Sequence, residues 1–444
     1  MSKSWPLLIL AGLMLFSAPL QAKVIQVKST KKLQKVIDKA APGDTLLLRA
    51  GVYEAQPTTV VDSLCGNCQN AITPHPMSYG FHITKPIVIR GEDFGKVVLK
   101  TNAGYGVFID GAENVTLENL SITGGVRDTS GLATDGGVVV RNSRTVLQGV
   151  AIRGNNNRAE GVIVGIAGVV GREGANLRVE DCLILDNSWD GIALYRGSRA
   201  VIEGNIIQTG RGAGVGITWD AVAEVRANEI SGYWKGIGSF GTTTAVVQDN
   251  LVRDLRGWGI VATGESVMDA AHNVIARTGN CGFAVWSEQS RGRFVDNIIY
   301  EAGRQKEWVC PEVGVWWNGP DDAFEAHHNV IWGSTAEGWR RSIWEDDPSG
   351  AATEPTQNIA VAPDSTWSGL YREIDPEFAD PEANDFRLVE TSPLAGAGFF
   401  AGHPGLSHPT DIGITAKSWE RILASRERYG MESPLSPSGE KNGD

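Results

Sequence analysis

The chain has 444 residues, of which 54 are glycine, and it carries a formal net charge of −12 at pH 7. This acidic balance argues against nucleic acid or an anionic membrane as a partner, because both would be repelled. An acidic polymer could still bind at a local basic patch or through a cation. The length allows two or three ordinary domains, but a repeating solenoid grows lengthwise and can remain one domain.

The first 22 residues have the features of a secretory signal peptide. Lys3 precedes an apolar run from Leu7 to Phe16, and Ala22 is a small residue before the expected cleavage point. The apolar run is too short to span a membrane. We therefore expect a periplasmic or secreted protein without a membrane span, whose mature chain begins at residue 23.

A short amphipathic segment follows the signal, with apolar side chains at Leu33, Val36, Ile37 and Ala40. The turn Pro42-Gly43-Asp44 separates it from a predicted strand over residues 45–48. The first coil of a stacked solenoid exposes both its apolar core and an unpaired strand edge. The segment is therefore predicted to be a helix that caps the N-terminal end of such a stack.

The middle of the chain repeats one polar position, with aliphatic residues two positions away on both sides. From Asn205 to Asn297 the interval is 22 to 24 residues, which is typical of stacked β-coils. Asparagine suits this position because its amide both donates and accepts, so stacked copies can form a hydrogen-bonded ladder. The predicted register residues are Asn119, Gly149, Cys182, Asn205, Asn228, Asn250, Asn273, Asn297, Asn329 and Asn358.

Several segments together resemble the right-handed parallel β-helix proteins of the pectate-lyase-like superfamily. They are LQKVIDKAAPGDTLLLRAGVY, ITKPIVIRGE, the coils with the asparagine register, and DPEFADPEANDFRLVETSPLAGAG. The resemblance implies an all-β, right-handed parallel β-helix over residues 23–400. A C-terminal cap and tail would then occupy residues 401–444, with a helix expected from Lys417 to Tyr429.

The resemblance does not select one activity, because the superfamily includes lyases, hydrolases, epimerases and sugar-binding periplasmic proteins. The catalytic motifs of polygalacturonases, of alginate epimerases, and of the chondroitinase B and alginate lyase group are absent from the sequence. Site residues must therefore be inferred from the chain itself.

The five cysteines become informative in an oxidising compartment. Cys281 and Cys310 lie at nearly matching points of consecutive coils, and we predict a disulfide between them. Cys65 and Cys68, in the sequence CGNC, could pair across a tight loop or bind a metal. Cys182 occupies the buried register and is expected to stay reduced.

Unequal coil lengths predict a trough on one edge of the solenoid. Insertions at residues 124–136, 155–160 and 302–312 would form tall loops at both ends of a low stretch of about five coils. At ~4.8 Å per strand this stretch is roughly 24 Å long and could accept several sugar units. A long N-terminal excursion around Tyr79 could also overhang it.

Aromatic and charged residues gather on the predicted floor of the trough. Aromatic rings stack on the C–H face of a pyranose, and neighbouring charges bind hydroxyls or carboxylates. The alternative is that the aromatic stripe packs under a loop or at a subunit contact. The candidate substrate-binding residues are Trp189, Tyr195, Trp219, Trp234, Phe240, Trp258 and Trp286.

Elimination from a uronate needs a cation that stabilises the enolate, a base for the C5 proton and an acid for the leaving oxygen. Lys235 and Arg256 are about one coil apart and could supply the base and the electrostatic support. Lysine can act as a base only if desolvation or neighbouring cations, such as Arg211, lower its pKa. Tyr233 could instead carry the proton.

Two other chemistries remain open. A hydrolase or epimerase would use paired carboxylates, for which Asp190 and Asp220 are candidates. Glu265 and Glu288 are 23 residues apart and should stack in adjacent coils, where they could share a calcium ion. A non-catalytic periplasmic sugar-binding or assembly protein would need neither arrangement. The leading hypothesis is a polysaccharide lyase acting on a uronic-acid polymer.

Overall fold

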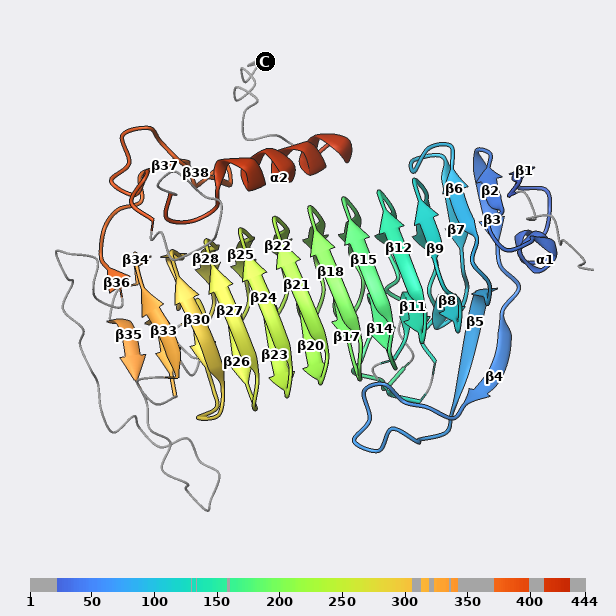
Figure 1. The fold of residues 1–444 in the computed structure, drawn as a ribbon, viewed down its shortest axis with the longest axis horizontal. Coiled ribbons are helices and arrows are strands. Elements are labelled where there is room, and N and C mark those ends of the chain that lie inside the picture. The colour runs from blue at the N-terminus through green and yellow to red at the C-terminus, as the bar shows by residue number, and fades with distance from the viewer. Residues whose placement is uncertain are drawn as a thin grey trace, which may run out of the picture.

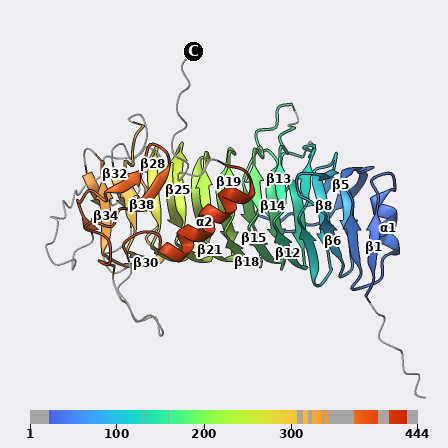
Figure 2. The ribbon, with the colours of Figure 1, turned by 90° about the horizontal axis from the view of Figure 1, so that it is seen from above.

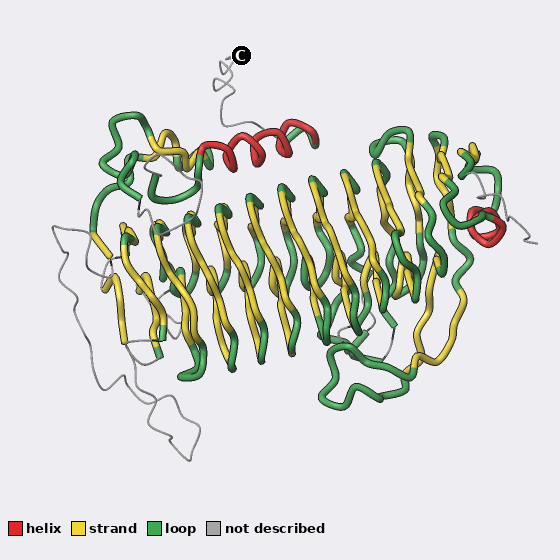
Figure 3. Tube along the Cα trace, viewed as in Figure 1, coloured by secondary structure: helices red, strands yellow, loops and turns green. Residues whose placement is uncertain are grey.

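The computed structural model describes residues 22–128, 130–132, 134–157, 160–305, 313–318, 323–334, 337–341, 371–398 and 411–431. These residues form an elongated stack of coils in which each coil contributes one strand to each of three sheets (Figure 1). Figure 3 shows the strands running side by side along the stack, with turns and loops at the edges. Neighbouring coils pair in parallel, so the predicted parallel β-helix is confirmed.

The first sheet is entirely parallel and contains, in spatial order, β1 (Val24–Val27), β2 (Thr45–Leu48), β6 (Val88–Gly91), β9 (Val115–Glu118), β12 (Arg144–Gln148), β15 (Asn176–Glu180), β18 (Arg199–Glu203), β21 (Val222–Arg226), β24 (Thr244–Gln248), β27 (Val267–Ala271), β30 (Arg291–Val295) and β33 (Phe324–His327).

The second sheet is likewise parallel and contains β3 (Gly51–Glu54), β7 (Val97–Lys100), β10 (Ser121–Thr123), β13 (Ala151–Arg153), β16 (Leu183–Leu185), β19 (Ile206–Gln208), β22 (Glu229–Ser231), β25 (Leu251–Leu255), β28 (Val274–Thr278), β31 (Ile298–Tyr300), β34 (Asn329–Trp332) and β36 (Tyr371–Arg372).

The third sheet is parallel apart from its β4–β5 hairpin and contains β4 (Thr58–Asp62), β5 (His75–Ile83), β8 (Tyr105–Asp110), β11 (Gly136–Arg141), β14 (Ala167–Arg172), β17 (Ile192–Leu194), β20 (Ala213–Trp219), β23 (Lys235–Gly241), β26 (Trp258–Thr263), β29 (Phe283–Val285), β32 (Val313–Trp317) and β35 (Glu337–Arg341).

A ladder of asparagine side chains runs through the interior. The backbone N–H and the Nδ2 of Asn205 both donate to Oδ1 of Asn228, at 3.0 and 2.9 Å. The same pair of bonds repeats from coil to coil as far as Asn329. Cys182 lies at the N-terminal end of the ladder, where its backbone N–H donates to Oδ1 of Asn205 at 2.9 Å. The predicted internal line of asparagines is therefore confirmed.

The register was wrong by one residue in the earlier coils. Asn119 and Gly149 have positive φ angles of 55° and 59°, and the buried interior position is taken by Leu120 and Val150. The strands show the same offset, because Ser121 and Ala151 pair with each other and Ala151 pairs with Leu183. Asn and Gly are also the residues that best tolerate a left-handed backbone conformation. Either one can therefore occupy the left-handed position that directly precedes the buried interior position of a coil. Asn358 lies outside the described residues.

A column of glycines crosses the third sheet next to the ladder. A Cβ at Gly191, Gly214 or Gly236 would lie 2.5, 2.8 and 2.5 Å from the carbonyl oxygen of the glycine in the next coil. Any side chain would therefore push neighbouring coils apart. The column holds the coils close at the point where each chain enters the third sheet.

Two helices occur among the described residues, at the two segments where the sequence predicted them. Helix α1 (Leu33–Lys39) stands at the N-terminal end of the stack (Figure 1), and its Leu33 and Ile37 belong to the main buried core. Helix α2 (Ala416–Arg428) lies across the strands of the second sheet, as seen from above in Figure 2. Before it, β37 (Phe378–Asp380) and β38 (Asp385–Leu388) form an antiparallel pair. Among the described helices, none has the length and apolarity needed to cross a membrane.

Helix α2 is anchored by apolar and ionic contacts. Trp419 and Ile422 join a buried cluster with Leu251 and other second-sheet residues. Arg426 Nε lies 2.6 Å from Glu229, whose carboxylate is also bound by Arg253. Because Glu229 is almost fully buried, these two guanidinium groups hold its pKa below the ordinary value against the cost of desolvation.

The cysteines give one disulfide among the described residues. Cys65 and Cys68 are bonded to each other, with Cα atoms 5.4 Å apart, so the CGNC sequence closes a tight loop. Cys182 is buried, and burial raises the pKa of its thiol to about 12. The predicted partner of Cys281, Cys310, lies outside the described residues.

We predict that Asn250→Ala lowers the free energy of unfolding by about 3 kcal/mol or more. The substitution removes the acceptor of the buried Asn228 backbone N–H and the donor to the carbonyl oxygens of Val225 and Gln248. Each buried polar group left without its hydrogen bond costs about 1–3 kcal/mol. Chemical denaturation followed by circular dichroism measures the change. Thr244→Ala, at an exposed position of the preceding strand β24, is the control and should stay within about 0.5 kcal/mol. Equal stability of the two variants would contradict a structural role for the ladder.

Candidate active site

A pocket of about 490 Å³ opens on the outer face of the third sheet. Its floor is formed by β20 and β23, and the turns before β17, β20, β23 and β26 form its lower edge. The lining combines aromatic rings, cations and one carboxylate with several small residues. The lining residues are Asn67, Ile163, Trp189, Asp190, Tyr195, Arg211, Gly212, Ala213, Gly216, Thr218, Trp234, Lys235, Phe240 and Arg256.

The coil stacking brings Asp190 and Lys235 to one side of this pocket. Ala213 pairs with Lys235 in the next coil, and its backbone N–H donates to Oδ1 of Asp190 in the preceding coil at 2.7 Å. The two charged residues are thus two coils apart, with Ala213 in the coil between them. All three residues line the pocket, and the small side chain of Ala213 occupies little of it.

Gly212 makes room for the Asp190 carboxylate, and Gly216 lies beside it. A Cβ at Gly212 would lie 1.8 Å from Oδ1 of Asp190, which is an impossible approach. A Cβ at Gly216 would lie 3.4 Å from Oδ2. The sequence Arg-Gly-Ala-Gly at residues 211–214 therefore serves both the pocket and the glycine column.

Burial shifts the proton affinity of both charged groups. It raises the pKa of Asp190 to about 6, against the opposing effects of the Ala213 N–H and of Lys235. It lowers the pKa of Lys235, against the opposing charge of Asp190. Both shifts favour the neutral forms, as expected for ionisable groups removed from water.

Aromatic faces surround the ammonium group of Lys235. Its Nζ lies 5.0 Å from the centroid of Phe240 and 5.8 Å from that of Trp258. Cation–π attraction at these distances orients the lysine while its charge remains poorly hydrated. The amine is therefore held in place without an ordinary hydrogen-bonded ion pair to Asp190 in the structure described.

Two arginines complete the pocket wall. Arg211 Nη1 donates to the carbonyl oxygen of Ile163 at 3.2 Å, and Arg256 Nη2 donates to that of Gly210. Both side chains are exposed, so their other N–H groups can reach a ligand. With Lys235 they give three cations against the single carboxylate of Asp190 among the lining residues. An acidic protein thus presents a locally cationic pocket.

A series of tryptophans extends from the pocket toward the C-terminal coils. The rings of Trp234 and Trp258 are 6.1 Å apart, those of Trp258 and Trp286 are 5.8 Å apart, and those of Trp286 and Trp316 are 5.6 Å apart. We call these four residues the tryptophan row. Trp258 and Trp286 were predicted as substrate-binding residues; they flank the pocket without lining it.

Three predicted site residues lie elsewhere. Tyr233 is fully buried in the main core, and its ring packs beneath Gly210, so it cannot carry a proton to a substrate. The ring of Trp219 lies 4.4 Å from the guanidinium of Arg196 and packs against a buried cluster around Tyr195. Asp220 is exposed and accepts a hydrogen bond from the Gly197 N–H at 2.8 Å, outside the pocket.

The predicted calcium ligands Glu265 and Glu288 are both exposed. Their coils are adjacent, because Val261 pairs with Ala284 in the preceding strand segment. Within the described residues no group of three or more His, Cys, Asp or Glu side chains could hold a metal ion. Their role as a calcium pair stays a prediction.

The boundary of the pocket differs from the predicted one. The loop over residues 124–136 contributes no lining residue, and most of residues 302–312 lie outside the described chain. Instead, Asn67 and Ile163 form the N-terminal side. Asn67 belongs to the disulfide-closed CGNC loop, part of the N-terminal excursion between β4 and β5. The length of that excursion was the feature of the sequence that could have pointed to Asn67.

The fold and the surface pocket define a parallel β-helix protein with a candidate ligand site on its outer face. The sequence model described as "Right handed beta helix region" matches residues 90–242 and 167–331, together more than half of the chain. The protein therefore belongs to the right-handed β-helix family. A comparison of the sequence with curated proteins gave no match.

Solved structures with the same fold include several carbohydrate-active enzymes. The pectate lyase Pel9A has a TM-score of 0.54 at 14% identity, over 89% of this chain and 96% of its own. The GH136 lacto-N-biosidase from Eubacterium ramulus gives 0.46 at 13% identity, over 72% and 64%. The PL6 family polysaccharide lyase Pedsa3628 from Pseudopedobacter saltans gives 0.38 at 15% identity, over 88% and 99%. At 14% identity the similarity to Pel9A establishes the fold alone.

The raised pKa of Asp190 predicts a specific dependence of stability on pH. A carboxyl whose pKa is higher in the folded state contributes stability below its unfolded pKa of about 4, and this is lost as pH rises through 6. Asp190→Asn removes the ionisation, so the variant should gain roughly 2–3 kcal/mol relative to wild type between pH 4 and pH 7. Denaturation curves at several pH values test this. A stability difference that does not change with pH would show that Asp190 ionises normally.

Proposed function

We propose that the protein is a polysaccharide lyase that cleaves a uronic-acid-containing polymer by β-elimination. The observation that carries this proposal is the composition of the pocket: Lys235, Arg211 and Arg256 face a cavity with one carboxylate, and burial lowers the pKa of the lysine. Trp234, Trp258 and Trp286 of the tryptophan row are partly exposed and offer stacking surfaces for further sugar rings. The fold shared with pectate lyase Pel9A is compatible with this activity.

The chemistry follows from the charges of these three residues. Arg211 and Arg256 bind the uronate carboxylate, which withdraws electrons from C5 and makes its proton more acidic. The neutral amine of Lys235 takes the C5 proton. The electron pair forms the C4–C5 double bond while the C4–O bond breaks. The Lys235 ammonium then returns its proton to the leaving oxygen.

Asp190 positions and tunes the lysine in this scheme. Its negative charge opposes the lowering of the Lys235 pKa, so it keeps the amine basic enough to accept a proton. Its own Oδ1 is fixed by the Ala213 N–H at 2.7 Å. The carboxylate therefore acts through Lys235 and need not touch the substrate.

A glycoside hydrolase is less well supported because it requires two carboxylates about 5–9.5 Å apart across the scissile bond. Among the described lining residues Asp190 is the one carboxylate, and Asp220 lies outside the pocket. A purely sugar-binding protein would use the same arginines and tryptophans. It would have no need for a lysine with a lowered pKa.

The direct test is to incubate the mature chain with a panel of uronic-acid polymers, with and without calcium. Absorbance of the unsaturated uronate measures elimination, and new reducing ends measure cleavage by either route. Reducing ends without the absorbance would favour the hydrolase. Binding without either product would favour the sugar-binding alternative.

Lys235→Ala should reduce turnover by about 10²–10⁴-fold, the usual contribution of a general base. Lys235→Arg should be similarly inactive while still binding the polymer, because a guanidinium keeps the charge and does not deprotonate. Steady-state rates of unsaturated product formation give both values, with circular dichroism to confirm folding. Activity within a few-fold of wild type in either variant would contradict the assignment of Lys235 as the base.

Trp234→Ala should mainly weaken substrate binding. It removes one stacking surface, worth about 0.5–1.5 kcal/mol, and leaves Lys235 in place. The expected result is a roughly 2- to 12-fold higher KM with little change in kcat. Val267→Ala, at an exposed position of the first sheet, is the control. A fall in kcat at unchanged KM would instead indicate that Trp234 helps to position the catalytic lysine.

A further inference from the structure

We infer that the disulfide-closed loop is a fixed end wall of the pocket, so that the protein acts on a chain end of its polymer and releases short products. This inference rests on the proposed function and specifies its mode of action. We call residues 63–74 the end-wall loop. It places Asn67 in the pocket lining on the N-terminal side, while the tryptophan row continues on the C-terminal side.

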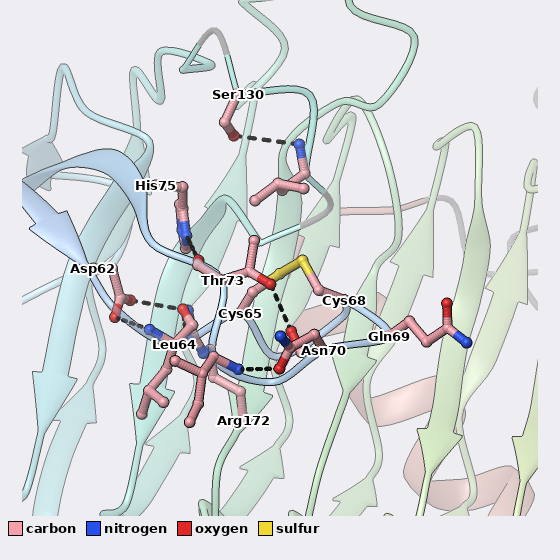
Figure 4. Close-up of a disulfide and its surroundings, with 12 residues drawn as sticks. Asp62, Leu64, Cys65, Cys68, Gln69, Asn70, Thr73, His75, Ser130 and Arg172 are labelled. Atoms are coloured by element: carbon pink, nitrogen blue, oxygen red, sulfur yellow. Dashed lines mark hydrogen bonds and ion pairs between the residues drawn. A yellow bond between two sulfur atoms is a disulfide. The ribbon is translucent and has the colours of Figure 1, made fainter.

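The end-wall loop is held in one conformation by bonds within the loop itself. The Cys65–Cys68 disulfide spans its tip, and the Cys65 N–H donates to the Ala71 carbonyl at 2.8 Å. Figure 4 shows the disulfide with Leu64, Asn70 and Arg172 around it. A loop of this size with two internal crosslinks has few alternative conformations.

Two arginines, Arg172 at the end of β14 and Arg196 in the turn after β17, hold the loop to the coils beneath it. Arg172 is fully buried; it donates to the Leu64 carbonyl at 2.6 Å and forms an ion pair with Asp62 at 3.2 Å. Arg196 donates to the carbonyl oxygens of Cys68 and Gln69, the latter at 3.1 Å. Breaking the bond to Leu64 would leave an N–H of the buried Arg172 guanidinium without its acceptor, which costs about 1–3 kcal/mol. The loop is therefore a wall and not a movable lid.

The end-wall loop covers the coil of β17, two coils before that of Lys235. The backbone of Gly66 lies so close to the sheet that a Cβ there would be 3.3 Å from the ring of Tyr195 and 3.0 Å from Arg172. Tyr195, on the coil of β17, is consequently almost fully buried. Lys235 lies on a strand two coils further on, which is a rise of about 10 Å along the stack at ~4.8 Å per strand. This distance provides space for a short piece of sugar chain between the wall and the base.

A polymer that continued past Lys235 in both directions would collide with the end-wall loop. A chain end can enter, with the rest of the polymer lying along Trp234, Trp258 and Trp286. The wall thus sets the length of the released product, and Asn67, whose amide can donate and accept, contacts its terminal sugar.

The first experiment compares viscosity loss with double-bond formation on a long uronate polymer. We expect wild type to accumulate short unsaturated products from the earliest times while viscosity falls slowly. The Cys65→Ser/Cys68→Ser variant, and wild type treated with reductant, should give longer products and a faster fall in viscosity per bond cleaved. Gln69→Ala, an exposed side chain in the same loop, should behave as wild type. A broad ladder of early products from wild type would overturn the inference and leave the lyase assignment intact.

The second experiment does not require turnover and guards against a misfolded disulfide variant. Binding of oligouronates to Lys235→Ala is measured by calorimetry, using oligomers with a bulky cap at the reducing end, at the non-reducing end or at neither. We expect one cap to weaken binding at least ten-fold and the other to have little effect. Equal affinities for all three would overturn the end wall. End-dependent binding by a protein that shows no elimination would support the wall and refute the lyase chemistry.

Discussion

The pairing of each coil with its neighbours is the constraint on which the whole structure depends. A single coil buries little surface, so its conformation is fixed by the backbone bonds, the asparagine ladder and the glycine column that it shares with adjacent coils. The ladder matters because its amides would otherwise be buried without partners. One bond pattern, repeated from Asn205 to Asn329, thereby sets which residues of successive coils lie above one another.

That alignment is also what creates the candidate active site. Asp190, Ala213 and Lys235 are separated by more than twenty residues in sequence, yet the coil register places them in consecutive positions on one face. The surrounding aromatic rings and the end-wall loop exclude water from the pocket. Desolvation raises the pKa of Asp190 and lowers that of Lys235, so it favours the neutral form of each. The exposed Arg211 and Arg256 also line this pocket, so a protein with a net charge of −12 still presents a locally cationic surface there.

The sequence was sufficient to predict the repeating fold and much of the pocket composition, since both follow from periodicity. It was insufficient wherever a side chain's direction depends on the exact path of a turn. Tyr233 and Trp234 are neighbours in one short turn, but one points into the core and the other into the pocket. Coil length alone cannot distinguish them. Asn67 was missed because its loop is a long excursion without a repeat to align it.

The register error has a similar physical origin. Asn119 and Gly149 were aligned with the interior asparagines, but they occupy the preceding left-handed position. In later coils that position is filled by residues such as Ala227 and His272. Asparagine fits both the left-handed position and the interior position that follows it. The residue type alone therefore cannot show which of the two positions an asparagine occupies. Strand pairing resolves the ambiguity.

The glycine column gives the molecule a property that ordinary globular domains lack. Any coil of 22 or 23 residues with one interior asparagine and one column glycine presents the same two faces to the coils above and below it. Duplication or loss of such a unit between Asn205 and Asn297 would preserve the asparagine bonds and the close glycine approach at the junction. Evolution can thus change the length of the third-sheet face in steps of about 4.8 Å without redesigning these shared contacts.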